Sequence, residues 1–117
     1  MCGIAGFLTD KDFDKETILC MTRELGHRGP DSAGTWLDDK EGIVFGHTRL
    51  AILDLSENGK QPMVSPSGRY VISYNGEIYN HLEIRKEIEN SMSQNINWKG
   101  SSDTETILHS FDTWGIK

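Results

Sequence analysis

The chain opens with the apolar stretch Met1-Cys2-Gly3-Ile4-Ala5-Gly6-Phe7-Leu8, in which larger residues alternate with small ones. β-Branched and aromatic residues interleave with small residues up to Leu8 and polar residues follow, which predicts a buried strand over residues 2–8. Gly3 and Gly6 would weaken an ordinary strand. We therefore expect another backbone, or a ligand, to come close to this strand.

A helix is expected next, because Asp14 has the side chain of an N-cap and apolar residues at helical spacing follow it. The apolar residues are Ile18, Met21 and Leu25, and Gly26 is a typical C-terminal stop. The dipeptide Gly29-Pro30 predicts a loop over residues 27–32. Cys20 is expected to face the core side of this helix and to be inert.

Further strands and helices are predicted along the rest of the chain. The expected strands cover residues 33–37, 43–50 and 69–74, with a turn over residues 38–42 and a loop over residues 56–68. The expected strand over residues 69–74 stops at Asn75-Gly76, a strong turn dipeptide. Helices should begin at Asn80 and Ser102, each with a glutamate in capping-box position. Their apolar positions are Leu82, Ile84 and Ile88 in the first helix, and Ile107, Leu108, Phe111 and Trp114 in the second. This order of elements indicates an α+β domain.

The bulk composition favours one domain with no nucleic-acid or membrane partner. The 117 residues carry a formal net charge of −6 without any basic patch, which argues against nucleic acid and anionic membranes. No apolar run approaches the roughly 20 residues that span a bilayer, and the opening stretch lacks the features of a signal peptide. Two cysteines are too few for a disulfide framework, so a reducing, cytoplasmic location is the default expectation.

Cys2 is the sharpest chemical feature. An initiator methionine is commonly removed before a small residue, and the mature chain would then begin with a cysteine. Such a residue carries a thiol and an α-amine that titrate near neutrality, so the amine can take the proton of the thiol without a separate histidine. From its position alone, Cys2 would more often be a small apolar residue. The spacing of Cys2, Cys20, His27 and His47 excludes a structural zinc site, so no metal is expected.

Five segments in order carry a resemblance to a known superfamily. They are Met1-Cys2-Gly3-Ile4-Ala5-Gly6, His27-Arg28-Gly29-Pro30-Asp31-Ser32, His47-Thr48-Arg49-Leu50-Ala51-Ile52, Tyr74-Asn75-Gly76-Glu77-Ile78-Tyr79-Asn80 and Ser101-Ser102-Asp103-Thr104-Glu105. Together they resemble the class II glutamine amidotransferases. The chain is most similar to the glutaminase domain of glutamine-hydrolysing asparagine synthetase, because Arg49-Leu50-Ala51-Ile52-Leu53-Asp54-Leu55-Ser56 is followed by Gln61-Pro62-Met63.

The resemblance implies a fold and a reaction. The implied fold is an αββα sandwich of antiparallel sheets flanked by helices, the N-terminal-nucleophile hydrolase type, incomplete in this chain. The implied reaction is glutamine hydrolysis, with Cys2 attacking the side-chain amide. The Asn75 side chain and the Gly76 N–H would bind the oxyanion. Arg49 would grip the α-carboxylate.

Further roles are implied for the substrate's α-ammonium group. Glu77 and Asp103 are the candidate ligands, with Asp103 preferred, and backbone carbonyls near Ile52 and Leu53 would help. His27 and Arg28 are expected to brace the loop near Cys2 rather than to transfer protons. His81 and His109 are expected to be surface or helix residues.

Structural alternatives stand beside these roles. Arg49 alone would more often be a surface arginine at a strand end. Asn75-Gly76 would more often be a hairpin turn. Asp103 would more often be a helix cap, and can be cap and ligand together. The joint occurrence of these residues favours the functional interpretation.

The resemblance also implies parts that lie outside residues 1–117. The family's glutaminase domain continues with further strands and joins a synthetase domain that uses ATP and Mg²⁺, whereas no cofactor is expected in this domain itself. An isolated fragment with unpaired strand edges should be marginally stable or prone to associate, and a homodimer is one form that such association can take. Two alternatives stay open. The chain is a catalytically silent glutamine-binding module, or it serves a relative whose acceptor is a sugar or another carboxylate instead of aspartate.

Overall fold

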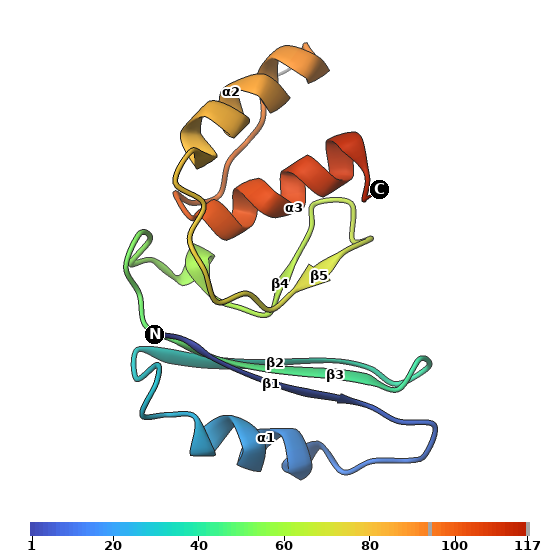
Figure 1. Ribbon diagram of the computed structural model, residues 1–117. Helices are drawn as coiled ribbons and strands as arrows, with labels where there is room; N and C mark the ends of the chain where they lie inside the picture. Colours follow the sequence, from blue (N-terminus) through green and yellow to red (C-terminus); the bar gives the residue numbers. More distant parts are fainter. Residues whose placement is uncertain (94, 117) are drawn as a thin grey trace. The chain divides into compact units, whose positions relative to one another are not determined.

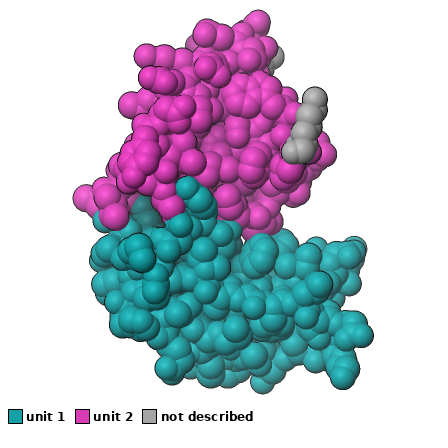
Figure 2. Space-filling view, in the orientation of Figure 1, with its two compact units in different colours: residues 1–51, 60–62, 73–75 teal, residues 52–59, 63–72, 76–117 magenta. Residues whose placement is uncertain are grey.

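A computed structural model describes residues 1–93 and 95–116 of the chain, and these residues form an α+β structure with antiparallel sheets (Figure 1). The chain divides into two compact units (Figure 2). Unit 1 comprises residues 1–51, 60–62 and 73–75, and unit 2 comprises residues 52–59, 63–72 and 76–117. Within the described residues, no helix has both the length and the apolar character needed to cross a membrane.

Unit 1 is a three-stranded antiparallel sheet with one helix packed on it. Its strands are β1 (Gly3–Leu8), β2 (Ser32–Asp38) and β3 (Ile43–Arg49), in the order β1-β3-β2, and the helix is α1 (Lys15–Glu24). The three predicted strands are therefore confirmed, with ends one or two residues from the expected ones. The middle strand is the most buried, because it is paired on both sides.

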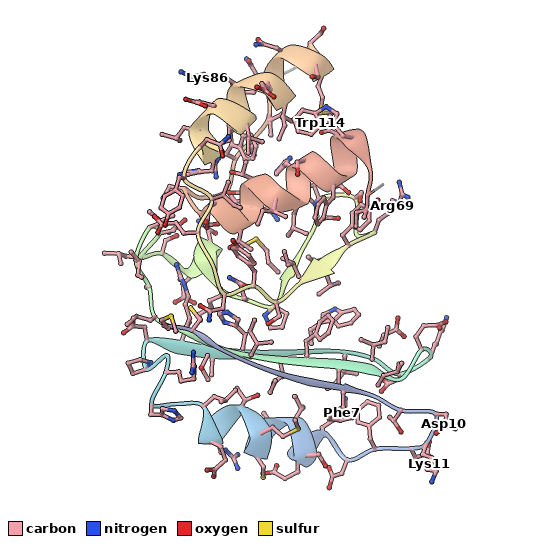
Figure 3. The ribbon with its side chains drawn as sticks, viewed as in Figure 1. Phe7, Asp10, Lys11, Arg69, Lys86 and Trp114 are labelled. Atoms are coloured by element: carbon pink, nitrogen blue, oxygen red, sulfur yellow. The ribbon has the colours of Figure 1, made fainter. Side chains whose placement is uncertain are left out.

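Small residues let α1 and the neighbouring chain lie close to the sheet. A Cβ atom on Gly46 would lie 2.2 Å from Thr22 Oγ1, and one on Gly3 would lie 2.8 Å from Leu25 Cβ. A Cβ on Gly6 would lie 2.7 Å from the backbone oxygen of Val44. The close approach expected at the glycines of the first strand is confirmed. Phe7 packs edge-on against Phe13, with ring centroids 5.6 Å apart (Figure 3).

The first helix begins as predicted but turns a different side to the sheet. Asp14 accepts a hydrogen bond from the Glu16 N–H at 2.9 Å, as an N-cap should. Ile18 and Thr22 are its buried residues, whereas Met21 is 37% exposed. Cys20 is also exposed and lies 3.7 Å from a Glu16 carboxylate oxygen, so its predicted core-facing position is wrong. A threonine can occupy the buried stripe because its hydroxyl bonds the Ile18 carbonyl at 2.7 Å.

Unit 2 combines a short hairpin with two helices. Its elements are the 3₁₀ helix η1 (Glu57–Gly59), the strands β4 (Met63–Val64) and β5 (Val71–Ile72), and the helices α2 (His81–Met92) and α3 (Asp103–Trp114). The strands pair antiparallel, and α3 packs against both of them and against α2. The expected loop over residues 56–68 therefore contains η1 and β4, and the expected strand over residues 69–74 keeps only two residues.

Two turn and cap predictions in unit 2 need correction. The hairpin turns between β4 and β5, where Ser65 N–H bonds the Tyr70 carbonyl at 2.8 Å and Gly68 has a φ of +73°. Asn75-Gly76 follows β5 and joins no strand pair, because β4 supplies the partner earlier in the chain. Asn80 does precede α2, but its side chain makes no capping bond. Its carbonyl accepts from Glu83 and Ile84 N–H groups instead.

The last helix follows the prediction at its start. Ser102 accepts from the Glu105 N–H at 3.2 Å, which is half of a capping box. The Glu105 carboxylate reaches past Ser102 to the Lys99 and Gly100 N–H groups at 2.7 and 3.0 Å. Leu108 is buried as expected. Trp114, at the C-terminal end of α3, is 44% exposed, so the expected apolar face is not buried along the whole helix (Figure 3). Leu82 of α2 is likewise 62% exposed.

Candidate active site

The thiol of Cys2 lies against the backbone that leaves β3. The Leu50 N–H donates to Cys2 Sγ at 3.4 Å, and the thiol lies 3.8 Å from the Leu50 carbonyl oxygen. Gly3 pairs with Thr48, so continuing the register places Cys2 beside Arg49. The cysteine is partly buried and makes no disulfide.

The loop over residues 27–32 fixes this end of the sheet. Arg28 Nε donates to the Cys2 carbonyl at 3.1 Å. Asp31 is bound twice, because its N–H donates to the Arg49 carbonyl at 3.0 Å and its carboxylate accepts from the Ala51 N–H at 2.8 Å. A Cβ on Gly29 would lie 2.4 Å from the backbone carbon of Thr48, so the loop can cross β3 only with a glycine there.

The expected bracing role of this loop is therefore confirmed for Arg28. His27 is exposed, and its Nδ1 lies 3.0 Å from the Glu24 carbonyl oxygen at the end of α1. Asp31 was not singled out from the sequence. The sequence feature that could have identified it is a carboxylate that directly follows Gly-Pro, because an aspartate in such a turn commonly accepts hydrogen bonds from nearby backbone N–H groups.

Arg49 ends β3 and is 8% exposed. Successive side chains of a strand point to opposite faces. The Thr48 hydroxyl bonds the Leu25 carbonyl at 3.0 Å on the face that α1 covers, so Arg49 lies on the other face. A buried guanidinium at a strand end does not fit the alternative of an exposed surface arginine.

Asn75 belongs to unit 1, where the residue before it is held firmly. The Tyr74 N–H donates to Gln61 Oε1 at 2.6 Å, and His47 Nε2 lies 3.1 Å from the Tyr74 carbonyl oxygen. Asn75 itself is exposed. Cys2, Arg49 and Asn75 are thus the predicted site residues that unit 1 contains.

Unit 2 contains the other predicted residues. Gly76, Glu77, Ile52 and Leu53 are exposed there, with Ile52 at 72%. Asp103 is buried, and its Oδ2 accepts from the Ile78 N–H at 2.8 Å. The cap of α3 is Ser102, so Asp103 is the first helical residue and not the cap. Its carboxylate fastens the segment that follows Gly76 and Glu77.

A buried charge network surrounds the start of α3, and sequence reasoning missed it. Arg85 of α2 donates to the carbonyls of Gly100 and Ser102 at 3.0 and 2.9 Å and to the Thr106 hydroxyl at 2.8 Å. Its NH2 lies 3.4 Å from Glu105 Oε2. The guanidinium carbon also lies 4.1 Å from the centroid of the Trp98 ring. These contacts fix the backbone on both sides of Ser102, and with it Asp103.

Two histidines are buried. His109, expected to be a surface or helix residue, lies in α3 and is 9% exposed, and its ring packs at a tilt against Trp98, with 4.3 Å between centroids. Burial lowers its pKa, partly offset by Glu105 and Asp112. His47 is fully buried, and burial lowers its pKa too, with Arg49 adding to the effect. Both rings are therefore neutral at pH 7.

One cavity among the described residues lies apart from Cys2 and Arg49. A cavity of about 620 Å³ in unit 1 is lined by α1 and β2 residues such as Arg23 and Ser32, together with Thr48. It lies on the helix-covered face of the sheet, and Cys2 and Arg49 are not among the described residues that line it. No group of three His, Cys, Asp or Glu side chains in the described part of the chain could hold a metal ion.

Comparisons with known proteins match the whole chain. The model of a family described as "Glutamine amidotransferase domain" matches residues 1–117. The chain is 40% identical to "Asparagine synthetase [glutamine-hydrolyzing] 3" of Bacillus subtilis strain 168 over 97% of this chain and 18% of that protein. It is 37% identical to "Putative asparagine synthetase [glutamine-hydrolyzing] 2" of Methanocaldococcus jannaschii over 99% of this chain and 25% of that protein. It is 30% identical to "Amidase chry2" of Gibberella zeae over 99% of this chain and 18% of that protein. The chain thus spans a quarter or less of the length of these relatives.

Proposed function

Because the chain belongs to the glutamine amidotransferase domain family, we propose that it hydrolyses glutamine to glutamate and ammonia, with Cys2 as the nucleophile. The observation that carries this proposal is the Cys2 thiol, which is partly buried and receives an N–H from Leu50. Removal of Met1 would free the α-amine to accept the thiol proton. Neither the Arg28 bond to the Cys2 carbonyl nor the Leu50 bond to its sulfur involves that nitrogen.

In this mechanism the thiolate attacks the side-chain amide carbon of glutamine. The carbonyl oxygen becomes an oxyanion, for which Asn75 Nδ2 and the Gly76 N–H are the proposed donors. The C–N bond then breaks, and the proton held by the α-amine leaves with ammonia. Water attacks the resulting thioester, which releases glutamate and restores the thiol. Each transition state carries negative charge on oxygen, so preorganised donors lower both barriers.

The charged ends of glutamine call for complementary groups. Arg49 can bond the α-carboxylate in bidentate fashion. Asp103 is the proposed partner of the α-ammonium, and Glu77 is the second carboxylate candidate. A carboxylate accepts several hydrogen bonds, so the Ile78 N–H on Asp103 Oδ2 leaves capacity for an ammonium group. Backbone carbonyls near Ile52 and Leu53 complete the proposed substrate ligands.

The whole protein would use the ammonia in an ATP-dependent synthetase domain. Two of the named relatives are glutamine-hydrolysing asparagine synthetases, so aspartate is the proposed acceptor and ATP with Mg²⁺ the proposed cofactors of that domain. Residues 1–117 would then be part of an αββα sandwich in a cytoplasmic enzyme. Similarity to a protein named amidase keeps another acceptor in view.

The competing function is a glutamine-binding module without catalysis. In such a module Met1 would be retained, because a cysteine nitrogen acylated by a preceding residue is an amide and cannot act as a base. Its prediction is binding of glutamine without release of ammonia.

The decisive experiment joins intact-mass analysis of the N-terminus with an ammonia-release assay on glutamine. Cys2→Ala should lower the release rate at least about a thousandfold, since it removes the nucleophile. Cys20→Ala is the matched control, because that thiol is exposed on α1 and should leave the rate unchanged. A folded chain that has lost Met1, binds glutamine and still releases no ammonia would establish the silent module instead.

A further inference from the structure

The peptide unit before Asn75 is held at both ends by buried side chains. Gln61 Oε1 accepts from the Tyr74 N–H at 2.6 Å, and His47 Nε2 lies 3.1 Å from the Tyr74 carbonyl oxygen. His47 is fully buried and Gln61 is 8% exposed. All of these residues belong to unit 1. Neither His47 nor Gln61 has a role in the reaction described above.

The sheet explains why the two side chains meet there. Gly34 of β2 lies directly opposite His47 of β3, and opposite residues of an antiparallel pair share a face. A Cβ on Gly34 would lie 2.3 Å from the Gln61 carbonyl oxygen. The absent side chain therefore lets the Gln61 backbone settle on the sheet beside His47. Strand pairing thus places His47 beside the point at which the Gln61 backbone lies against Gly34.

The Tyr74 carbonyl oxygen determines which ring nitrogen of His47 carries the hydrogen. A carbonyl oxygen only accepts, so Nε2 must carry the hydrogen, and in the neutral ring Nδ1 is then an acceptor. Nδ1 is buried and has no hydrogen-bond partner in the described part of the chain. A buried polar atom without a partner costs about 1–3 kcal/mol. An apolar side chain would avoid that cost but would also remove the donor to the Tyr74 carbonyl, so the bond to this peptide is what the histidine contributes here.

We propose that His47 and Gln61 are positioning residues that fix the Tyr74 peptide, so that the Asn75 amide is aimed at the oxyanion before substrate arrives. This inference rests on the proposed role of Asn75. Oxyanion donors are effective because their orientation is set in advance, and small errors of placement weaken them. Glutamine binding through charged ends does not depend on this orientation, so His47 and Gln61 should affect kcat and not KM.

The kinetic test compares variants that keep or lose the hydrogen bond. His47→Leu and Gln61→Met should lower kcat for ammonia release roughly 10- to 100-fold, a fraction of the loss for an oxyanion donor, and change KM by less than about twofold. His47→Gln keeps an N–H donor of similar reach and should recover most of kcat. Equal losses in His47→Gln and His47→Leu, or a change in KM alone, would overturn the proposal.

A double-mutant cycle separates this role from a general effect on folding. If His47 acts through Asn75, His47→Leu should cost less than about twofold in an Asn75→Ala background. The same factor in both backgrounds would contradict the inference. If Cys2→Ala and Asn75→Ala both leave ammonia release intact, it is the proposed function that fails. If they suppress release while His47→Leu and Gln61→Met act like the wild type, only the positioning role fails.

Hydrogen exchange gives a second measurement that needs no turnover. Amide exchange at Tyr74 and Asn75 should speed up at least tenfold in His47→Leu and stay close to wild type in His47→Gln, because only the first loses the bond to the Tyr74 carbonyl. Exchange in β1 and α1 should be unchanged if the fold is intact. Where His47→Leu does not fold, Gln61→Met replaces it. Unchanged exchange at these two residues would overturn the proposal.

Discussion

The two units hold their proposed functional residues by different physical means. In unit 1 the fixing contacts are made with the backbone: strand register, glycines that admit a neighbouring backbone, and hydrogen bonds to backbone atoms of Cys2, Arg49 and Tyr74. In unit 2 the start of α3 is fixed by buried charges, chiefly Arg85 with Glu105. Strand register and hydrogen bonds to backbone atoms tolerate small changes, whereas a buried ion depends on its charged partner. Unit 2 should therefore be the more easily broken of the two.

The largest effect is expected from Arg85→Met. Arg85 and Glu105 side chains are 12% and 8% exposed, and removing one member of a buried pair costs about 3–5 kcal/mol because the other charge is stranded. Chemical denaturation should show this loss in the free energy of unfolding. Hydrogen exchange should place it in α2 and α3 and spare β1, β2 and β3.

The matched control is the exposed pair of Arg23 with Glu16, 2.8 Å apart with side chains 67% and 54% exposed. Arg23→Met should cost no more than about 1 kcal/mol, because solvent screens this pair. If Arg85→Met and Arg23→Met lower the free energy of unfolding by the same amount, the buried charges of unit 2 do not make it the more sensitive unit.

Gly46→Ala should produce the next largest effect, and in unit 1. The added Cβ would lie 2.2 Å from Thr22 Oγ1, so α1 must shift from the sheet at a cost of about 1–3 kcal/mol. Unfolding followed by Trp36 fluorescence reports the loss. Adding Thr22→Ala should recover part of it. Gly68→Asn is the control, because asparagine tolerates positive φ and nothing lies within 4 Å of that position.

Helix caps should give smaller and predictable losses. Ser102→Ala and Asp14→Ala each remove a side chain that accepts a backbone N–H and should cost about 1 kcal/mol in thermal or chemical unfolding. Asn80→Ala removes a side chain that makes no such bond, so its loss should be clearly smaller. An equal loss at Asn80 would show that cap bonds are not what stabilises these helix starts.

The smallest effect is expected on the pH dependence of stability. Burial lowers the folded-state pKa of His47 in unit 1 and of His109 in unit 2, so the unfolded chain binds more protons below about pH 6.5. Stability present above that pH should be lost as pH falls toward the folded pKa values. The slope per histidine is a fraction of about 1.4 kcal/mol per pH unit.

His47→Gln and His109→Gln should each flatten the fall in unfolding free energy between pH 7 and 5. His27→Gln replaces an exposed histidine and is the matched control. A steeper fall in either buried variant would reverse the assignment. Measuring both units by hydrogen exchange at each pH shows which histidine contributes to which unit.

The sequence predicted unit 1 well because its structure follows local patterns. The interleaving of large and small residues indicated the strands, and Asp14 indicated the start of the helix. Gly3 indicated that another part of the chain lies close to β1. What failed was the rotation of α1, since the choice between Met21 and Thr22 for the buried side depends on Gly46, far along the chain. The Asp31 and Tyr74 contacts are also long-range, and no periodicity encodes them.

Unit 2 was predicted less well for a different reason. Helix starts at Ser102 and near Asn80 were found, but short strands such as β4 have too few residues to show alternation. Arg85, Glu105 and His109 look like ordinary surface residues of amphipathic helices. Only the tertiary structure reveals that they are buried together. Among the proposed site residues, the sequence motifs pointed to Cys2, Arg49 and Asp103, and the structure added the groups that hold them.

The way in which Cys2 is anchored has a practical consequence for protein engineering. Its carbonyl is bound by Arg28 and its sulfur by Leu50, so none of the bonds described here depends on its nitrogen. A fusion partner or affinity tag placed before Cys2 should leave the fold intact while removing the proposed base. Tagged protein would then pass every test of folding and fail every test of turnover. Preparations intended for kinetics should carry no tag before Cys2, or be cut by a protease that leaves Cys2 as the first residue.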